Sequence, residues 1–357
     1  MVGDDRADVP LRLAPAAAHP RRARRGALAA GVAVVALAAS GCQASTVPGT
    51  PSVTSSRGTP TASASTATPT VLAVTASELT FAQDALVDPV VTGTVSGARG
   101  VRVDAQVFLD GAWVTQATAT PGADGSYSVK LTYGNGQLRS DRWRMVAGGV
   151  ASSEIAVERT AVLNPAVRAA TREELTYSWR EGCPVSYTAL RVLQVNYYGF
   201  DGLMHRGTLV VHEGAVAQFE GLLQTALDAR FPIAKMQPVD AYKAVDADSA
   251  ADNNTSAFNC RMTTLGSEWS QHSKGTAIDI NPVENPYSNA GLLIPPAGKP
   301  YLDRGNVRPG MLTAGSPVIK YALANGWTWL APTDYQHLER REAGGFGVWA
   351  AADGRGR

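Results

Sequence analysis

The chain has 357 residues, of which 45% are hydrophobic and 18% are charged. That length is typical of about two domains, and the apolar fraction is enough to bury a core. The formal net charge is only +1, so the composition gives no reason to expect a nucleic-acid partner.

The first 41 residues have the features of a secretory signal rather than of a folded segment. Four arginines within residues 21–25 precede an apolar run over residues 27–39, which is too short to span a bilayer. The run ends in Ala39-Ser40-Gly41-Cys42, which resembles a bacterial lipobox. The resemblance implies that Cys42 is lipidated and that the exported protein is anchored to the membrane, facing the cell wall. The alternative is an ordinary signal peptide and a secreted protein.

Residues 42–71 are expected to form a disordered linker. Half of residues 43–70 are Ser or Thr, four are Pro, and Arg57 is the only charged residue among them. A segment of this composition buries too little apolar surface to fold. We expect it to act as a flexible spacer between the membrane and the domains that follow.

Residues 72–161 contain the alternation of apolar and polar residues that is typical of half-buried strands. The alternation is clearest over residues 101–109, and Asp110-Gly111 follows as a hairpin signal. About seven short strands with regular turns predict a β-sandwich, and the segment resembles the immunoglobulin-like modules of bacterial surface proteins. It contains no His and no Cys, so we assign it no chemistry. A spacer role and a wall-contact role both stay open.

Residues 162–350 mix strands and helices without the strand–helix–strand repeat of a parallel sheet, which predicts an α+β domain. Residues 190–198 and 205–211 are expected to pair as a hairpin. Apolar residues at helical spacing predict an amphipathic helix over residues 214–229.

The later part of this domain gives shorter signals. Residues 233–238 are predicted to form a strand. Ser316-Pro317 and Gly326 are typical of the start and the end of a short helix. Residues 351–357 are expected to be a disordered tail.

Two short segments contain the residue types of a metal site. In the first, His272 and Asp279 lie on either side of Gly275, which allows a tight chain reversal between them. The second, Asp334-Tyr335-Gln336-His337, adds another imidazole. Two imidazoles and one carboxylate can hold zinc while a fourth position stays open for water. The alternative for either segment alone is a surface loop with an isolated histidine.

A further carboxylate beside such a metal can serve as a general base. Asp334 lies three residues before His337, so it can face the same metal, accept a proton from water and pass it to a leaving amine. Glu339 is a competing base, but its spacing favours a supporting role behind the ligands. The alternative for Asp334 is a solvent-exposed acid. We expect His205 and His212 to be structural or surface residues.

The remaining cysteines suggest a covalent link. If Cys42 is lipidated, Cys183 and Cys260 are left as an even pair in an oxidising compartment, so we expect a disulfide between them. Two buried free thiols are the alternative. Zinc ligation by Cys260 is disfavoured, because three better-placed ligands are present.

All fixed positions of the pattern Ser-x-His-x-x-Gly-x-Ala-x-Asp are present in residues 270–279. Together with Asp334-x-x-His337, they resemble the D-alanyl-D-alanine carboxypeptidase (VanY-like) family of zinc peptidases. The resemblance extends over residues 162–350 and includes residues 253–261 and 277–282. It implies a hedgehog/DD-peptidase-like α+β domain with one zinc ion per chain.

The resemblance also implies roles for individual side chains. It assigns three zinc ligands: His272, Asp279 and His337. Asp334 would be the base, and Arg261 would face the substrate and polarise the scissile carbonyl or its oxyanion. Ser270 and Tyr335 are expected to contact the substrate.

Two features depart from the commoner family pattern. Many relatives have an aromatic residue after the final histidine, where this chain has Leu338. An Asp base in place of Glu occurs in the endopeptidase branch of the family, so Asp334 weakens the distinction between carboxypeptidase and endopeptidase.

We therefore expect a zinc-dependent peptidase that hydrolyses peptidoglycan stem peptides, foremost as a D-alanyl-D-alanine carboxypeptidase. The first alternative is an L-alanyl-D-glutamate or crosslink endopeptidase, and the second is an inactive cell-wall-binding lipoprotein. The expected partners are peptidoglycan peptides and, through the lipid on Cys42, the membrane.

Overall fold

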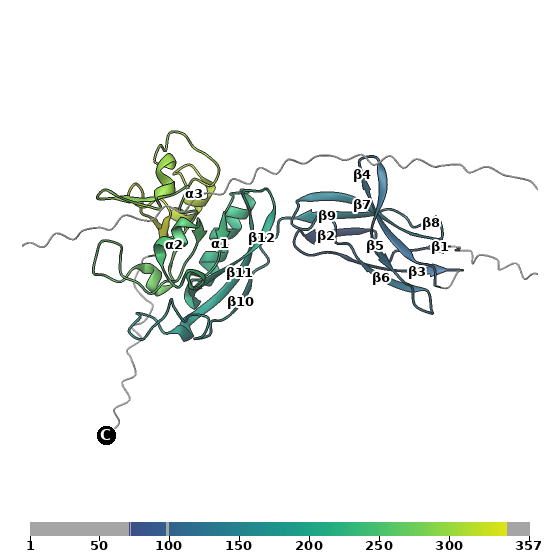
Figure 1. Ribbon diagram of the computed structural model, residues 1–357, viewed down its shortest axis with the longest axis horizontal. Coiled ribbons are helices and arrows are strands. Elements are labelled where there is room, and N and C mark those ends of the chain that lie inside the picture. Colours follow the sequence, from purple (N-terminus) through teal and green to yellow (C-terminus); the bar gives the residue numbers. More distant parts are fainter. Residues whose placement is uncertain (1–70, 72, 98–99, 341–357) are drawn as a thin grey trace, which may run out of the picture. The chain divides into compact units, whose positions relative to one another are not determined.

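The computed structural model describes residues 71, 73–97 and 100–340 (Figure 1). The predicted signal with Cys42, all but the last residue of the predicted linker, and the predicted tail lie outside the described residues. Strands predominate over helices in the part that is described. None of its helices is long and apolar enough to cross a membrane.

The N-terminal part consists of nine strands in two sheets around one hydrophobic core. The strands are β1 (Ala73–Val74), β2 (Thr80–Asp84), β3 (Val90–Ser96), β4 (Val103–Leu109), β5 (Ala112–Ala119), β6 (Ser126–Lys130), β7 (Arg139–Ala147), β8 (Val150–Ala151) and β9 (Ile155–Thr160). One sheet has the order β1-β3-β6 and the other the order β2-β9-β7-β4-β5, with β8 paired to β7. This part is therefore β-rich, as predicted, and two of its strands are only two residues long.

Alternating burial explains why these strands form two facing layers. Trp143 and Met145 of β7 point into the core and are fully buried, while Arg142 of the same strand is exposed on the other face. The hairpin between β4 and β5 closes through Asp110 and Gly111, which both have positive φ angles of 48° and 85°. Positive angles at both positions are what a two-residue hairpin turn requires.

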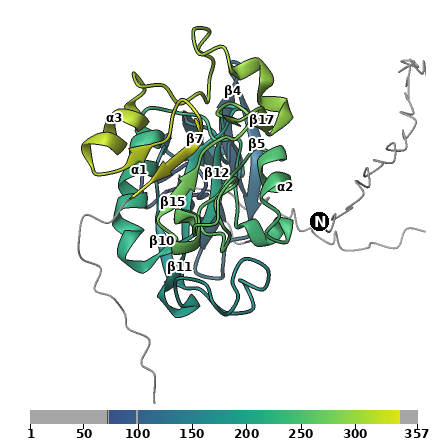
Figure 2. The ribbon, with the colours of Figure 1, turned by 90° about the vertical axis from the view of Figure 1, so that its left-hand side faces the viewer.

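The C-terminal part begins with an antiparallel sheet of order β10-β11-β12. Its strands are β10 (Ala166–Ala169), β11 (Leu190–Tyr198) and β12 (Met204–His212), so the predicted hairpin is confirmed. Helix α1 (Val216–Asp228) confirms the predicted amphipathic helix and buries Phe219 and Leu222. It lies beside helix α3 (Pro317–Ala324) in both views (Figures 1 and 2), and the ring of Phe219 meets that of Trp327 edge-on with centroids 5.2 Å apart.

Helix α3 begins and ends where its sequence signals predict. The Ser316 hydroxyl accepts a hydrogen bond from the Ile319 N–H, and Pro317 occupies the first helical position. Gly326 follows the helix with a φ angle of +79°.

Short elements make up the rest of this part. They are β13 (Lys235–Met236), α2 (Asp246–Ala251), β14 (Asn254–Thr255), β15 (Ala277–Asp279), β16 (Tyr287–Asn289), β17 (Leu292–Ile294), β18 (Thr328–Trp329) and β19 (His337–Glu339). The strand predicted over residues 233–238 is wrong in length, because only β13 pairs, with the two-residue β14. Pro232 and Pro238 lie on either side of it, and proline has no N–H to extend a ladder.

We predict that Phe219→Ala lowers the free energy of unfolding by about 3–5 kcal/mol, because it opens a cavity between α1 and Trp327. Urea unfolding of the full chain measures this loss. The control is Leu323→Ala on α3, whose side chain is 55% exposed and whose removal should cost less than about 0.5 kcal/mol. Equal losses for the two variants would contradict this description of the core.

Candidate metal centre

Strand pairing brings together two candidate ligands that are far apart in the sequence. Strands β15 and β19 are antiparallel, and Asp279 lies directly opposite His337 in the ladder. Directly opposed side chains share one face of a sheet and are close enough to interact. His337 Nδ1 accordingly lies 3.0 Å from Asp279 Oδ1.

The third candidate ligand, His272, comes from a single 3₁₀ turn, Gln271–Lys274. The Ser270 hydroxyl caps the start of this turn by accepting a hydrogen bond from the His272 N–H, 3.3 Å away. Gly275 ends it with a φ angle of +69°, and a Cβ atom there would lie 2.6 Å from the His212 nitrogen. The turn is thus fixed at both ends, and it places His272 Nε2 3.1 Å from Asp279 Oδ2.

Each imidazole has an inner nitrogen, which faces the other two candidate ligands, and an outer nitrogen, which donates a hydrogen bond to an acceptor. His272 Nδ1 donates to the Ala257 carbonyl, and His337 Nε2 donates to Glu339 Oε2 at 3.1 Å. A proton held on the outer nitrogen of each ring by these acceptors would leave both inner nitrogens free to bind a metal. Histidine ligands of metals are oriented in the same way by acceptors behind them. Glu339 thus has the supporting position that its spacing predicts.

The donor groups of these three residues form a compact triangle. His272 Nε2 lies 3.0 Å from His337 Nδ1, and Asp279 reaches the two rings through different oxygens, Oδ2 at 3.1 Å from His272 and Oδ1 at 3.0 Å from His337. Tetrahedral zinc, with ligands at about 2.0–2.1 Å, separates its ligand atoms by roughly 3.3 Å. The donor set and its spacing therefore fit zinc, with a small outward movement of each ligand.

The surroundings favour positive charge at the centre of this triangle. Burial opposes the ionised form of Asp279, but His272 and His337 outweigh it and hold the pKa of this carboxyl well below its usual range. Burial likewise opposes a charged His337, but hydrogen bonds to Asp279 and Glu339 raise its pKa to about 10. A divalent cation bound between these side chains would stabilise the ionised Asp279 in the same way that a protonated histidine does.

Asp334 stands beside the triangle in a cleft of about 390 Å³ that His337 and Arg261 also line. Burial, followed by the negative charge of Asp279, raises the pKa of the Asp334 carboxyl to about 7, although His337 and Arg261 lower it. Its Oδ1 atom is buried and has no hydrogen-bond partner among the described residues. An acid with a pKa near neutrality and an uncommitted oxygen is suited to general-base chemistry.

Arg261 lies on the wall of the same cleft, as the family resemblance implies. Its Nε atom is 2.9 Å from Asp246 Oδ1, and its Nη1 donates to the Met262 carbonyl at 3.2 Å. The side chain is 23% exposed. A guanidinium held in this way can present its remaining N–H groups to a developing oxyanion.

The two predicted substrate contacts, Ser270 and Tyr335, lie in different environments. Ser270 lines the cleft, but its hydroxyl is used to cap the turn that carries His272. Tyr335 does not line the cleft; its ring lies 6.1 Å from that of Trp329 and beneath the Arg304 guanidinium, 4.2 Å away. The substrate roles of Ser270 and Tyr335 stay predictions.

Sequence reasoning missed part of the cleft wall. Trp269 and residues 263–266 line it, and they belong to a loop that leaves and returns through a bridge between Met262 and Trp269. This loop has no apolar periodicity. Its position between Arg261 and the metal motif was the only feature of the sequence that could have indicated a place on the cleft wall.

Within the described residues, the other histidines and the two cysteines take no part in the triangle. His205 Nε2 lies 2.9 Å from Asp201 Oδ1 on the β11–β12 hairpin. His212 Nδ1 accepts a hydrogen bond from the Gly214 N–H. Cys183 and Cys260 form a disulfide, which leaves no thiolate of Cys260 for a metal.

We predict that the chain binds one zinc ion and that Asp279→Ala weakens this binding by more than the roughly 10–100-fold expected for loss of an outer partner. Competition with a chelating dye measures the affinity, and elemental analysis after dialysis measures the stoichiometry. Asp201→Ala is a matched control, because it also removes an aspartate paired with a histidine. Equal zinc affinity for both variants would show that Asp279 is not a ligand.

The comparisons with known proteins bear on the C-terminal part. A family model described as D-alanyl-D-alanine carboxypeptidase matches residues 264–340, which include the triangle and Asp334. No curated protein matches the chain.

Among solved structures, two chains of a marsupial T cell receptor are each 11% identical to this chain. The first covers 35% of this chain and 67% of its own length at a TM-score of 0.21, and the second covers 40% and 87% at 0.20. Likeness at this level supports no conclusion about fold or function. The family match, in contrast, supports a hydrolytic enzyme, a peptidase of the D-alanyl-D-alanine carboxypeptidase family.

Proposed function

We propose that the protein is a zinc-dependent peptidase that hydrolyses peptidoglycan stem peptides, foremost as a D-alanyl-D-alanine carboxypeptidase. One observation supports this above all: three side chains that could hold a metal converge beside a carboxyl group with one unbonded oxygen, inside the segment that matches the family model. His272, Asp279 and His337 would hold the zinc.

Each side chain has a distinct part in the proposed reaction. Bound zinc supplies Lewis-acid polarisation of the scissile carbonyl and lowers the pKa of a bound water. Asp334 accepts the proton of the attacking water on its carboxylate and then delivers it to the leaving amine. Arg261 donates hydrogen bonds to the oxygen on which negative charge develops.

One feature of the cleft favours a second candidate, an endopeptidase that cuts within stem peptides or crosslinks. Among the described residues that line the cleft, Arg261 is the sole arginine or lysine. A carboxypeptidase must also recognise the terminal carboxylate of its substrate, and charged partners are the strong way to do so. An internal amide places no such demand on the cleft. An inactive wall-binding protein is disfavoured, because the ligands and the base are all present.

We also propose that the protein is exported and anchored through a lipid on Cys42, with the β-rich part acting as an immunoglobulin-like spacer. The Cys183–Cys260 disulfide supports an oxidising compartment outside the cytoplasm. Membrane fractionation tests the anchor: Cys42→Ala should move the protein into the soluble fraction. If the variant stays in the membrane fraction, the proposed lipid anchor is wrong.

We predict that Asp334→Ala lowers peptide hydrolysis by about 10²–10⁴-fold, because it removes the proton acceptor. Zinc content should stay at the level of the unmodified chain, since Asp334 is not a proposed ligand. The assay is mass spectrometry of purified muropeptides incubated with the zinc-loaded full chain. Asp228→Ala, at the exposed end of α1, serves as the control and should retain full activity.

The products of the unmodified chain separate the candidates. Loss of a single terminal alanine establishes a carboxypeptidase, and a cut inside the peptide establishes an endopeptidase. No cleavage by a chain with confirmed zinc occupancy would contradict the proposed function. Unchanged cleavage by a zinc-loaded Asp334→Ala variant would contradict the role of Asp334.

A further inference from the structure

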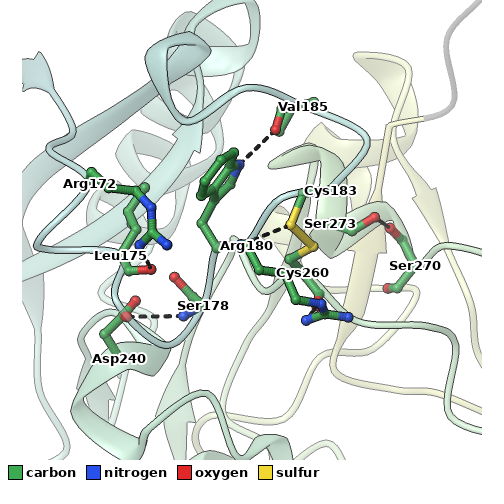
Figure 3. The surroundings of a disulfide bond; sticks show 11 residues. Arg172, Leu175, Ser178, Arg180, Cys183, Val185, Asp240, Cys260, Ser270 and Ser273 are labelled. Atoms are coloured by element: carbon green, nitrogen blue, oxygen red, sulfur yellow. Dashed lines mark hydrogen bonds between the residues drawn. A yellow bond between two sulfur atoms is a disulfide. The ribbon is translucent and has the colours of Figure 1, made fainter.

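Residues 178–183 form a short segment that contacts the backbone N–H, the backbone carbonyl and the side chain of Cys260. We call this segment the strap. The Cys260 N–H donates to the Ser178 carbonyl at 3.0 Å, and the Cys260 carbonyl accepts from Arg180 Nη1 at 2.8 Å. The Cys260 side chain is bonded to Cys183. Figure 3 shows these residues around the disulfide.

Arg180 links the strap to the cleft wall by a second contact. Its guanidinium carbon lies 5.9 Å from the centre of the Trp269 ring, within cation–π range, and Trp269 lines the cleft. The Arg180 backbone N–H also points to Cys183 Sγ at 3.2 Å. The exposed Arg180 therefore contacts the disulfide, Cys260 and the Trp269 ring of the cleft.

The chain that the strap holds leads directly into the proposed catalytic machinery. The Asn259 N–H donates to the His272 carbonyl at 3.1 Å, and Cys260 is followed by Arg261. The Arg261 carbonyl in turn accepts from the Ser270 N–H at 3.1 Å, which closes the base of the loop over residues 261–270. A displacement of Cys260 would thus move Arg261 and the loop.

The ring of His272 is also held by contacts that do not involve the strap. Its ring is oriented by the Ala257 carbonyl, and the next residue, Phe258, is bonded through its N–H to the Val210 carbonyl of β12 at 3.0 Å. The sheet therefore fixes the chain between the metal ligand and Cys260. Loosening the strap should affect Arg261 and spare the zinc site.

We propose that Arg180 is a positioning residue that acts through Cys260 to hold Arg261 and Trp269 at the cleft. The proposal rests on the proposed peptidase function, because Arg261 has a catalytic part only there. A single hydrogen bond from an exposed arginine adds little to the stability of a fold. The effect of Arg180 should therefore appear in catalysis and in the loop, and not in the melting temperature.

The experiment compares Arg180→Met with Arg172→Met in the zinc-loaded full chain. Arg172 belongs to the same region and lies 4.8 Å from the Trp179 ring, but it donates to the Leu175 carbonyl and has no bond to Cys260 (Figure 3). For Arg180→Met we expect kcat/KM on muropeptides to fall by about tenfold to a hundredfold, as displaced catalytic groups cause. Zinc affinity and melting temperature should equal those of Arg172→Met, and Arg180→Lys should restore part of the activity.

Hydrogen exchange of the amides in residues 261–270 gives a second readout that needs no activity. Arg180→Met should exchange faster there by about tenfold, because the base of the loop opens more often. If activity and exchange of Arg180→Met match those of Arg172→Met, or if zinc affinity falls as well, the proposal is overturned. If the unmodified chain cleaves nothing, the peptidase proposal fails, and exchange alone decides whether Arg180 holds the loop.

Discussion

The pairing of β15 with β19 is the interaction on which the candidate site depends. It places Asp279 opposite His337 across 58 residues of sequence, and no local turn could do so. The 3₁₀ turn that carries His272 then completes the triangle, because Ser270 and Gly275 fix its two ends. Burial of both strands gives the donors a low-dielectric setting, in which their convergence has large electrostatic consequences.

Burial also explains why the three acidic side chains near the triangle differ in ionisation and in contacts. His272 and His337 hold the Asp279 carboxyl in its ionised form, and Glu339 accepts a hydrogen bond from His337 Nε2. At Asp334, burial and the charge of Asp279 outweigh the opposing effects of His337 and Arg261, and the pKa of this carboxyl rises to about 7. Three carboxyl groups within one small region are thereby suited to the three proposed roles of ligand, orienting acceptor and base. Arg261 adds a positively charged side chain to the lining of the same cleft.

Much of this arrangement could be predicted from the sequence, and the missing parts have a common cause. Periodicity predicted the β11–β12 hairpin and α1, and the spacing around Gly275 predicted that His272 and Asp279 converge. His337 and Asp334 were added from the second segment and the family resemblance. The sequence could not predict that the Ser270 hydroxyl caps a turn or that Tyr335 lies beneath Arg304, since both follow from tertiary contacts. Trp269 was missed for the same reason, since its place on the cleft wall depends on the bridge to Met262 and on the contact with Arg180.

X-ray absorption spectroscopy at the zinc edge of the zinc-loaded full chain tests the central claim most directly. The account predicts a first shell of nitrogen and oxygen alone at about 2.0–2.1 Å, with the scattering signature of two imidazoles. A sulfur ligand at about 2.3 Å, or a shell of six oxygens without imidazole, would contradict it. Either result would mean that His272, Asp279 and His337 do not form the metal centre.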